Sequence, residues 1–242
     1  MDCRTLRADL VIETIDRLER RIAARFPEAG LRRVCADLSA AARQLAAEAE
    51  RLNRPQRWIR VGAWAVVAAG AGALGLIAAS LHYDGVDLDA ASFIQLLEPA
   101  MNLAVLVGIG LVGLSQAEMR WKRGRALSYL HSLRSIIHVV DMHQLTKDPY
   151  ALGDHLPLTE HSPKRILPAP LLERYLDYCS EMAALAGKLA ALLAQSCTDP
   201  GVVGAAGDVE ALTASLTRNC WQKIALIARV APRPASAAWT AE

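Results

Sequence analysis

Two apolar stretches constrain this chain more than any other feature of its sequence. Residues 61–81 read VGAWAVVAAGAGALGLIAASL and contain no charged residue. Residues 93–115 read FIQLLEPAMNLAVLVGIGLVGLS, and their most apolar part runs from Ala100 to Leu114. About 20 apolar residues in a helix cross a hydrocarbon core of roughly 30 Å. The two stretches therefore predict two transmembrane helices, at about 61–81 and 93–115, joined by an outside loop at 82–92.

The charges that flank these stretches predict their orientation. Four basic residues precede the first stretch: Arg51, Arg54, Arg57 and Arg60. Four more follow the second: Arg120, Lys122, Arg123 and Arg125. The segment between them has no Lys or Arg and carries Asp84, Asp87, Asp89 and Glu98. Because cytoplasmic flanks are enriched in Lys and Arg, we expect a multi-pass protein of the bacterial inner membrane with both termini in the cytoplasm.

The rest of the chain predicts a cytoplasmic helical bundle, so the expected fold class is all-α with a transmembrane hairpin at 56–118. Aromatic residues make up only 5% of the chain, which argues against sheets. Apolar residues recur at spacings of three and four, as in amphipathic helices. The expected parts are N-terminal helices at 1–55, a continuation helix at 119–147, a Pro-rich connector at 148–170, a helical hairpin at 171–230 and a disordered tail at 231–242.

The apolar positions of these helices predict the core of the bundle. The N-terminal helices present Val11, Ile15, Leu18, Ile22 and Phe26, then Leu31, Val34, Leu38, Leu45, Ala49 and Leu52. The continuation helix presents a heptad-like stripe of Leu130, Leu133, Ile137 and Val140, typical of coiled coils. The last two helices present Leu172, Tyr175, Cys179, Met182, Leu185, Leu189 and Leu192, then Val209, Leu212, Leu216, Ile224 and Ile227.

Six glycines lie in the two apolar stretches: Gly70, Gly72, Gly75, Gly108, Gly110 and Gly113. The last three match the dinucleotide fingerprint GxGxxG, but that motif needs a preceding strand. Inside an apolar helix, small residues instead let helix backbones approach closely. The glycines therefore indicate helix packing, either within the hairpin or between copies of the chain.

A polar stripe in the second stretch consists of Gln95, Glu98 and Asn102, with Pro99 expected in the first helical turn. Ionisable groups inside a membrane often mark ion paths. The stripe would line the outer mouth of an oligomeric pore. In the alternative interpretation, Glu98 is solvated at the interface and Asn102 is bonded to its partner helix.

A histidine cluster, HSLRSIIHVVDMH, follows the second stretch. His131, Arg134, His138 and Asp141 share one helical face, and His143 lies away from it. His131, His138 and Asp141 are weak metal candidates, because two histidines seven residues apart are separated by about 10.5 Å along a helix. A metal needs three or four converging ligands. Hydrogen bonding of His138 and Asp141 with each other or with a neighbouring helix is the preferred interpretation.

The remaining chemistry of the sequence is sparse. The net charge is +2, which does not indicate nucleic acid as a partner. The five cysteines form no CxxC pair and indicate reduced thiols. No nucleophile elbow or phosphate-binding loop occurs. We therefore expect no enzyme activity and no cofactor.

The layout of a helical N-terminal part, a hairpin near 61–115 and a long following helix resembles the SLATT group of bacterial two-transmembrane proteins. The resemblance implies a pore-forming effector that acts as a homo-oligomer. The segments DMHQLTKDP and YLDYCSEM also look like those of uncharacterised bacterial membrane proteins. From the residues themselves we expect a membrane-anchored helical scaffold whose partners are the lipid bilayer and, through its cytoplasmic helices, another copy or another protein. A homo-oligomeric ion channel is the alternative.

Overall fold

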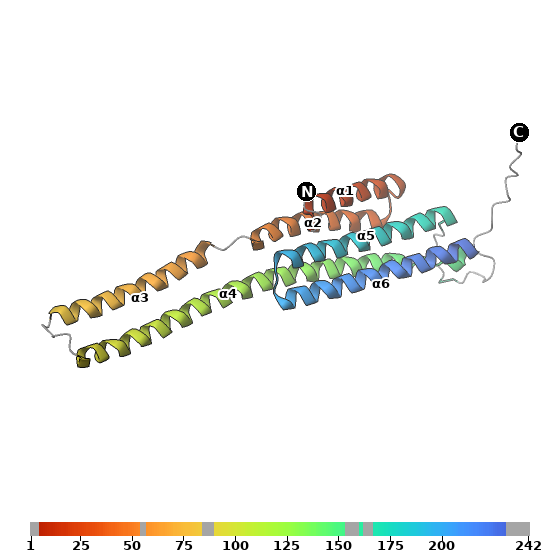
Figure 1. The fold of residues 1–242 in the computed structure, drawn as a ribbon. Coiled ribbons are helices and arrows are strands. Elements are labelled where there is room, and N and C mark those ends of the chain that lie inside the picture. Colours follow the sequence, from red (N-terminus) through yellow and green to blue (C-terminus); the bar gives the residue numbers. More distant parts are fainter. Residues whose placement is uncertain (1–4, 54–56, 84–89, 153–159, 162–166, 231–242) are drawn as a thin grey trace, which may run out of the picture. The chain divides into compact units, whose positions relative to one another are not determined.

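A computed structural model describes residues 5–53, 57–83, 90–152, 160–161 and 167–230 (Figure 1). Within these ranges the chain is entirely helical, which confirms the all-α prediction. The elements are α1 (Ala8–Arg25), α2 (Gly30–Asn53), α3 (Arg57–Tyr83), α4 (Ala90–Leu145), the short 3-10 helix η1 (Pro149–Leu152), α5 (Ala169–Ser196) and α6 (Pro200–Val230). The expected tail at 231–242, most of the connector and residues 84–89 of the expected loop lie outside the described residues.

The chain divides into two compact units. One unit, here called the bundle, comprises Met1–Arg51 and Ala126–Glu242. The other, here called the hairpin unit, comprises Leu52–Arg125. The helix α4 contributes its first part to the hairpin unit and its last part, from Ala126, to the bundle.

The bundle is organised around α5, in which 15 of 28 residues are buried. The apolar stripes predicted for α1, α2, the end of α4 and α5 are all buried, and in α6 Val209, Leu216 and Ile227 are buried. Leu212 and Ile224 are half-buried. The stripe of Leu130, Leu133, Ile137 and Val140 is 1–2% exposed. This stripe is therefore part of the core rather than a free face for a partner.

Local signals fix the ends of these helices. Residues 26–30 interrupt the first amphipathic pattern, and α1 ends at Arg25 while α2 begins at Gly30. The turn before α6 is made by Asp199, whose Oδ1 accepts hydrogen bonds from the backbone N–H groups of Gly201 (2.9 Å) and Val202 (3.2 Å). This side-chain cap satisfies amides that have no partner inside the helix.

Two close contacts show how the bundle helices are held together. A Cβ atom on Gly187 of α5 would lie 2.8 Å from Thr213 Oγ1 of α6, so the glycine permits the close approach of these helices. Between α1 and α2, Asp16 accepts hydrogen bonds from Ser39 (2.8 Å) and from Arg43 (2.7 Å). The hydrogen bonds of Asp16 thus add polar contacts beside the apolar interface of α1 and α2.

In the hairpin unit, α3 and the first part of α4 run antiparallel. A Cβ atom on Gly62 would lie 2.8 Å from Leu114 Cδ2, and one on Gly70 would lie 2.7 Å from Val107 Cγ2. Between them, a Cβ atom on Gly110 would lie 3.3 Å from Val66 Cγ1. As the residue numbers of the contacting glycines and valine on α3 increase, those of their partners on α4 decrease. The two helices are therefore antiparallel.

The apolar side chains of the hairpin unit are exposed. The apolar window in the Leu97–Leu145 part of α4 has none of its residues buried. By length and composition, this is the one helix among the described residues that could cross a membrane. The described apolar part of α3, Val61–Leu76, is shorter.

The helix α4 begins before the predicted start at residue 93, so Pro99 lies in its interior rather than in its first turn. Proline is tolerated within helices of the membrane type because neighbouring groups can satisfy the carbonyl that it leaves free.

Candidate functional site

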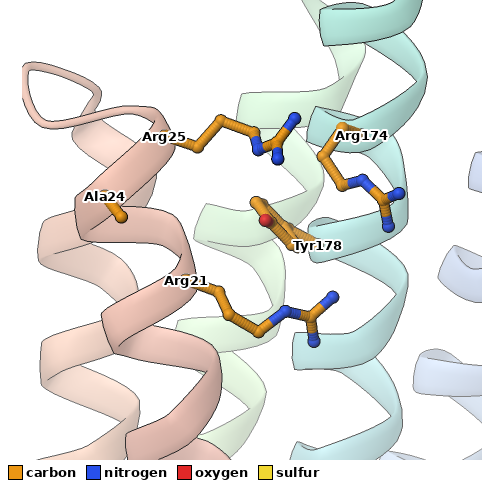
Figure 2. A pocket seen from close by; sticks show the side chains of 5 residues that line it. All are labelled: Arg21, Ala24, Arg25, Arg174 and Tyr178. Atoms are coloured by element: carbon orange, nitrogen blue, oxygen red, sulfur yellow. The ribbon is translucent and has the colours of Figure 1, made fainter.

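A basic pocket lies between α1 and α5 of the bundle, with a volume of about 630 Å³. Its lining consists of Arg21, Ala24 and Arg25 from α1 and of Arg174 and Tyr178 from α5. In Figure 2, Arg21 and Arg25 extend from α1 toward α5 on either side of Tyr178. The Tyr178 side chain extends from α5 toward α1. The guanidinium groups of Arg21 and Arg25 thus lie beside Tyr178, whereas that of Arg174 points away from this ring.

Helix periodicity explains why these residues share the pocket. Arg21 and Arg25 are four residues apart on α1, as are Arg174 and Tyr178 on α5. Residues three and four apart lie on the same helical face. The buried face of α1, which includes Ile22, packs into the bundle and leaves the arginines at its edge. The contact between α1 and α5 then brings the two faces together.

Two of the three arginines are held by carboxylates that do not line the pocket. Arg21 donates to Glu181 Oε2 at 2.7 Å, and Arg174 donates to Asp177 Oδ2 at 2.8 Å. The hydrogen bond with Glu181 raises the pKa of Arg21. Among the described residues, the structure records no acceptor for Arg25.

Tyr178 forms a fixed wall of this pocket. It is 3% exposed, and its ring packs edge-on against Phe26 with a centroid distance of 6.1 Å. The Arg21 guanidinium carbon lies 5.1 Å from the centroid of the same ring, within the range of a cation–π contact. Arg21 is thus held by Glu181 and by Tyr178 together.

A second polar group lies at the end of α4, in the segment DMHQLTKDP. Lys223 of α6 donates to the carbonyl oxygens of Gln144 (2.7 Å) and Lys147 (3.1 Å). The last carbonyls of a helix have no partner within it, so this cation caps α4 from another helix. Burial lowers the pKa of Lys223.

His143 and Tyr175 connect this helix end to α5. The Tyr175 hydroxyl lies 3.3 Å from His143 Nδ1, and Lys147 Nζ lies 5.0 Å from the centre of the Tyr175 ring. Burial, together with the charges of Lys147 and Arg33, lowers the pKa of His143. Burial raises the pKa of Tyr175. The pair is therefore neutral at pH 7, which suits a structural contact.

Burial suppresses the reactivity of the Cys35 and Cys220 thiols in the bundle. Cys35, Cys179, Cys197 and Cys220 are buried and free. Burial raises the pKa of Cys220 to about 11 and that of Cys35 to about 12. Because the thiolate is the reactive form, these groups do not act as nucleophiles at neutral pH.

The predicted histidine cluster does not converge. His131 and His138 are exposed on α4. The Asp141 carboxylate accepts a hydrogen bond from Gln144 Nε2 at 2.8 Å. In the part of the chain that the structure describes, no group of three or more His, Cys, Asp and Glu side chains could hold a metal ion. Of these three histidines, His143 makes a tertiary contact. Helical spacing had placed it away from the face that His131 and His138 share.

Of the predicted polar stripe, Glu98 and Asn102 are exposed in the single chain. Both lie on α4, and their spacing of four residues places them on one face. The backbone of Gln95 is helical, but its side chain lies outside the described residues.

The six predicted packing glycines divide into two groups. Gly70 and Gly110 lie against side chains of the opposite helix, so they pack within the hairpin unit. The other four have open space at their Cβ positions: Gly72, Gly75, Gly108 and Gly113. Gly62, which the sequence argument did not name, has the same packing role as Gly70.

The basic pocket was missed because its residues belong to helices that are far apart in the sequence. The available signal was the pair Arg21 and Arg25, spaced by one helical turn. A pair of this kind is ordinary on a solvated helix. Only the packing of α1 against α5 brings Arg174 into the same pocket as Arg21 and Arg25.

Comparisons of the chain with protein-family models, with curated proteins and with solved structures give no match. The likeness in layout to the SLATT group therefore stays an expectation from the sequence.

Proposed function

We propose that the chain is a membrane-anchored helical interaction protein. In this proposal α3 and the first part of α4 form a two-pass hairpin in the inner membrane, and the bundle is a cytoplasmic module. The observation that carries it is the exposure of large apolar side chains along the hairpin unit. They include Val61, Trp64, Leu76, Leu97, Met101, Val105, Leu106, Ile109 and Val112, each at least 46% exposed. A monomer in water rarely exposes so large a contiguous apolar surface.

The antiparallel register supports the proposed topology. It places the start of α3 beside the part of α4 near residue 118, because Gly62 is paired with Leu114. Both basic flanks then lie at the same end of the hairpin unit. Basic flanks favour the cytoplasmic side, and Trp121, 40% exposed, lies near that end, where indole rings favour an interface.

An apolar stripe supports a protein partner for the bundle. Val139 and Met142, 43% and 62% exposed, lie three residues apart on α4, and Leu145 is 57% exposed. These residues are distinct from the buried heptad-like stripe. Exposed apolar residues at helical spacing favour docking of another helix.

Fractionation and labelling test the anchor and its topology. We expect the full chain to stay in the membrane pellet after an alkaline carbonate wash. With Cys3→Ser as background, a membrane-impermeant maleimide should label Asp87→Cys in intact cells. The matched variant Ser135→Cys, at an exposed position of the bundle, should be labelled only after lysis. Release by carbonate, or labelling of Ser135→Cys in intact cells, would contradict the proposal.

A homo-oligomeric channel is the second candidate, because Glu98 and Asn102 are exposed and share one face of α4. Two helices alone do not enclose a water-filled path, so this function requires several copies. Light scattering of the detergent-solubilised protein should then give four or more copies. Ion flux into liposomes should change with Glu98→Gln. A monomer or dimer with background flux argues against the channel and leaves the anchor in place.

A further inference from the structure

We propose that the basic pocket between α1 and α5 binds a phosphate-bearing anion. Its lining side chains are three arginines, one alanine and one tyrosine, and no carboxylate belongs to it. The uncharged part of the lining is the methyl group of Ala24 and the side chain of Tyr178. A ligand that fits this lining is small, polar and negatively charged.

Charge and donor number favour phosphate. The planar guanidinium group carries five N–H donors in a fork that matches phosphate oxygens. One donor atom of Arg21 and one of Arg174 are recorded with a carboxylate, which leaves others on each group. Arg25 adds a third guanidinium, with no recorded acceptor among the described residues. A phosphate group offers several acceptor oxygens and up to two charges, which suits a pocket with more than one guanidinium group in its lining.

The pocket is also preorganised. Arg21 is held by Glu181 at 2.7 Å and lies over the ring of Tyr178. Tyr178 is itself fixed against Phe26. Arginines that are already positioned lose less conformational entropy when a ligand binds. The volume of about 630 Å³ lies within the range of small-molecule sites.

A second pocket of the bundle provides a contrast. It has a volume of about 390 Å³ and lies between α1 and α2. Its lining includes Arg32 and Arg33 but also Glu19 and Glu28. Here the acidic and basic side chains face the same space, so an anion would meet repulsion as well as attraction. Of these two pockets, the one between α1 and α5 has charged lining residues of a single sign.

Titration calorimetry on the full chain in detergent at low ionic strength tests the site. The probes are inorganic phosphate and pyrophosphate, and we expect saturable binding of one of them. Arg25→Gln should weaken this binding on the order of 10-fold, because it removes a charge-assisted hydrogen-bond donor. Arg25 is exposed and has no recorded partner, so the variant should melt at the same temperature as the unaltered chain.

The matched control is Arg17→Gln, on the same helix but outside the pocket, where Arg17 pairs with Glu13 at 2.8 Å. It should leave the affinity unchanged. Equal affinity in Arg25→Gln and Arg17→Gln would overturn the proposal. So would the absence of saturable binding to every phosphate probe.

A second arm distinguishes a soluble phosphate from a lipid headgroup. The full chain is placed in nanodiscs of phosphatidylcholine with or without phosphatidic acid. If phosphatidic acid lowers the affinity for inorganic phosphate in the unaltered chain but not in Arg25→Gln, a headgroup occupies the site. If the affinity does not change, the site binds a soluble anion. The assay reports on the pocket alone, so its failure leaves the proposed membrane anchor untouched, and the reverse also holds.

Discussion

The bundle and the hairpin unit use the same kinds of residues in opposite ways. In the bundle, Leu176 and Leu189 are fully buried on α5. In the hairpin unit, Leu106 and Ile109 of α4 are 65% and 64% exposed. The free energy of apolar burial therefore stabilises the bundle within the chain, whereas the hairpin unit leaves large apolar side chains uncovered.

The two units also differ in how their helices approach each other. The bundle joins helices mostly through large side chains and polar bonds, such as the Lys223 cap on α4, although Gly187 also lies against Thr213. The hairpin unit joins α3 and α4 where Gly62 and Gly70 meet larger side chains. In lipid, helices gain little from apolar burial between them, so close packing at small residues becomes more important. The difference agrees with the proposed membrane anchor, in which only the hairpin unit contacts lipid.

The largest expected effect comes from a matched pair of leucines. Leu176→Ala should lower the free energy of unfolding of the bundle by about 2–5 kcal/mol, because it leaves a cavity in the core. Leu106→Ala should change it by less than about 0.5 kcal/mol. Hydrogen exchange measured on α5 peptides of the full chain reports the bundle alone. Similar effects of the two substitutions would remove the distinction between the units.

Two lysine substitutions compare the stabilisation from a helix cap with that from an ion pair. Lys223→Met should destabilise the bundle by about 1.5–3 kcal/mol, since two carbonyls at the end of α4 lose a charged donor. Lys122→Met removes an i,i+4 pair with Glu118 in the hairpin unit and should cost less than about 1 kcal/mol. Hydrogen exchange at the end of α4 and around residue 120 measures both. An equal effect would mean that the cap adds nothing beyond an ordinary ion pair.

Two glycine substitutions test how α3 packs against α4 in the hairpin unit. Gly70→Val should destabilise the contact of α3 with α4 by about 1–3 kcal/mol, because its Cβ atom would overlap Val107. Gly72→Val has open space and should leave this contact intact. Disulfide cross-linking between Val66→Cys and Gly110→Cys in detergent measures the contact. If Gly72→Val instead changes the mass of the protein in detergent, the open glycines pack between copies.

The smallest expected effect is a pH dependence confined to the bundle. The pKa of His143 in the folded chain lies below its ordinary value of 6.5, so the unfolded chain binds this proton more readily. The contribution of neutral His143 to the free energy of unfolding is full above pH 6.5. It is lost as the pH falls through the pKa of His143 in the folded chain. His143→Gln should reduce the loss of α5 protection between pH 7.5 and pH 5, whereas exposed His138→Gln should not. If α5 protection depends on pH in His143→Gln as it does in the unaltered chain, other groups cause this dependence.

Periodicity in the sequence predicted the helices and most of the core. The residues at spacings of three and four on α1 and α2, from Val11 to Leu52, are buried because a one-sided apolar helix has to cover that side. The cap of α6 by the Asp199 carboxylate is equally local, since it involves the next residues of the chain. These features depend on neighbours in the sequence, so a pattern of a few residues contains the information.

The pocket and the helix-end contacts depend on residues that are distant in the sequence. Arg21 meets Glu181, and Lys223 meets the carbonyl of Gln144, only after the helices have packed. The helical spacing placed His131, His138 and Asp141 on one face of the helix and left His143 away from it. The structure instead places His143 against Tyr175 and Gly30. Local spacing defines a helical face, but the element that covers the face is a property of the whole fold.

The antiparallel register of α3 and α4 has a consequence for how such a chain can change in length. An insertion of one residue between Gly62 and Gly70 would turn the following positions by about 100° around the helix axis. A larger side chain would then occupy the space beside Val107 that Gly70 now leaves open. An insertion or deletion of seven residues, which is close to two full helical turns, would restore the face. The register of α3 against α4 therefore restricts the spacing of these glycines as well as their identity.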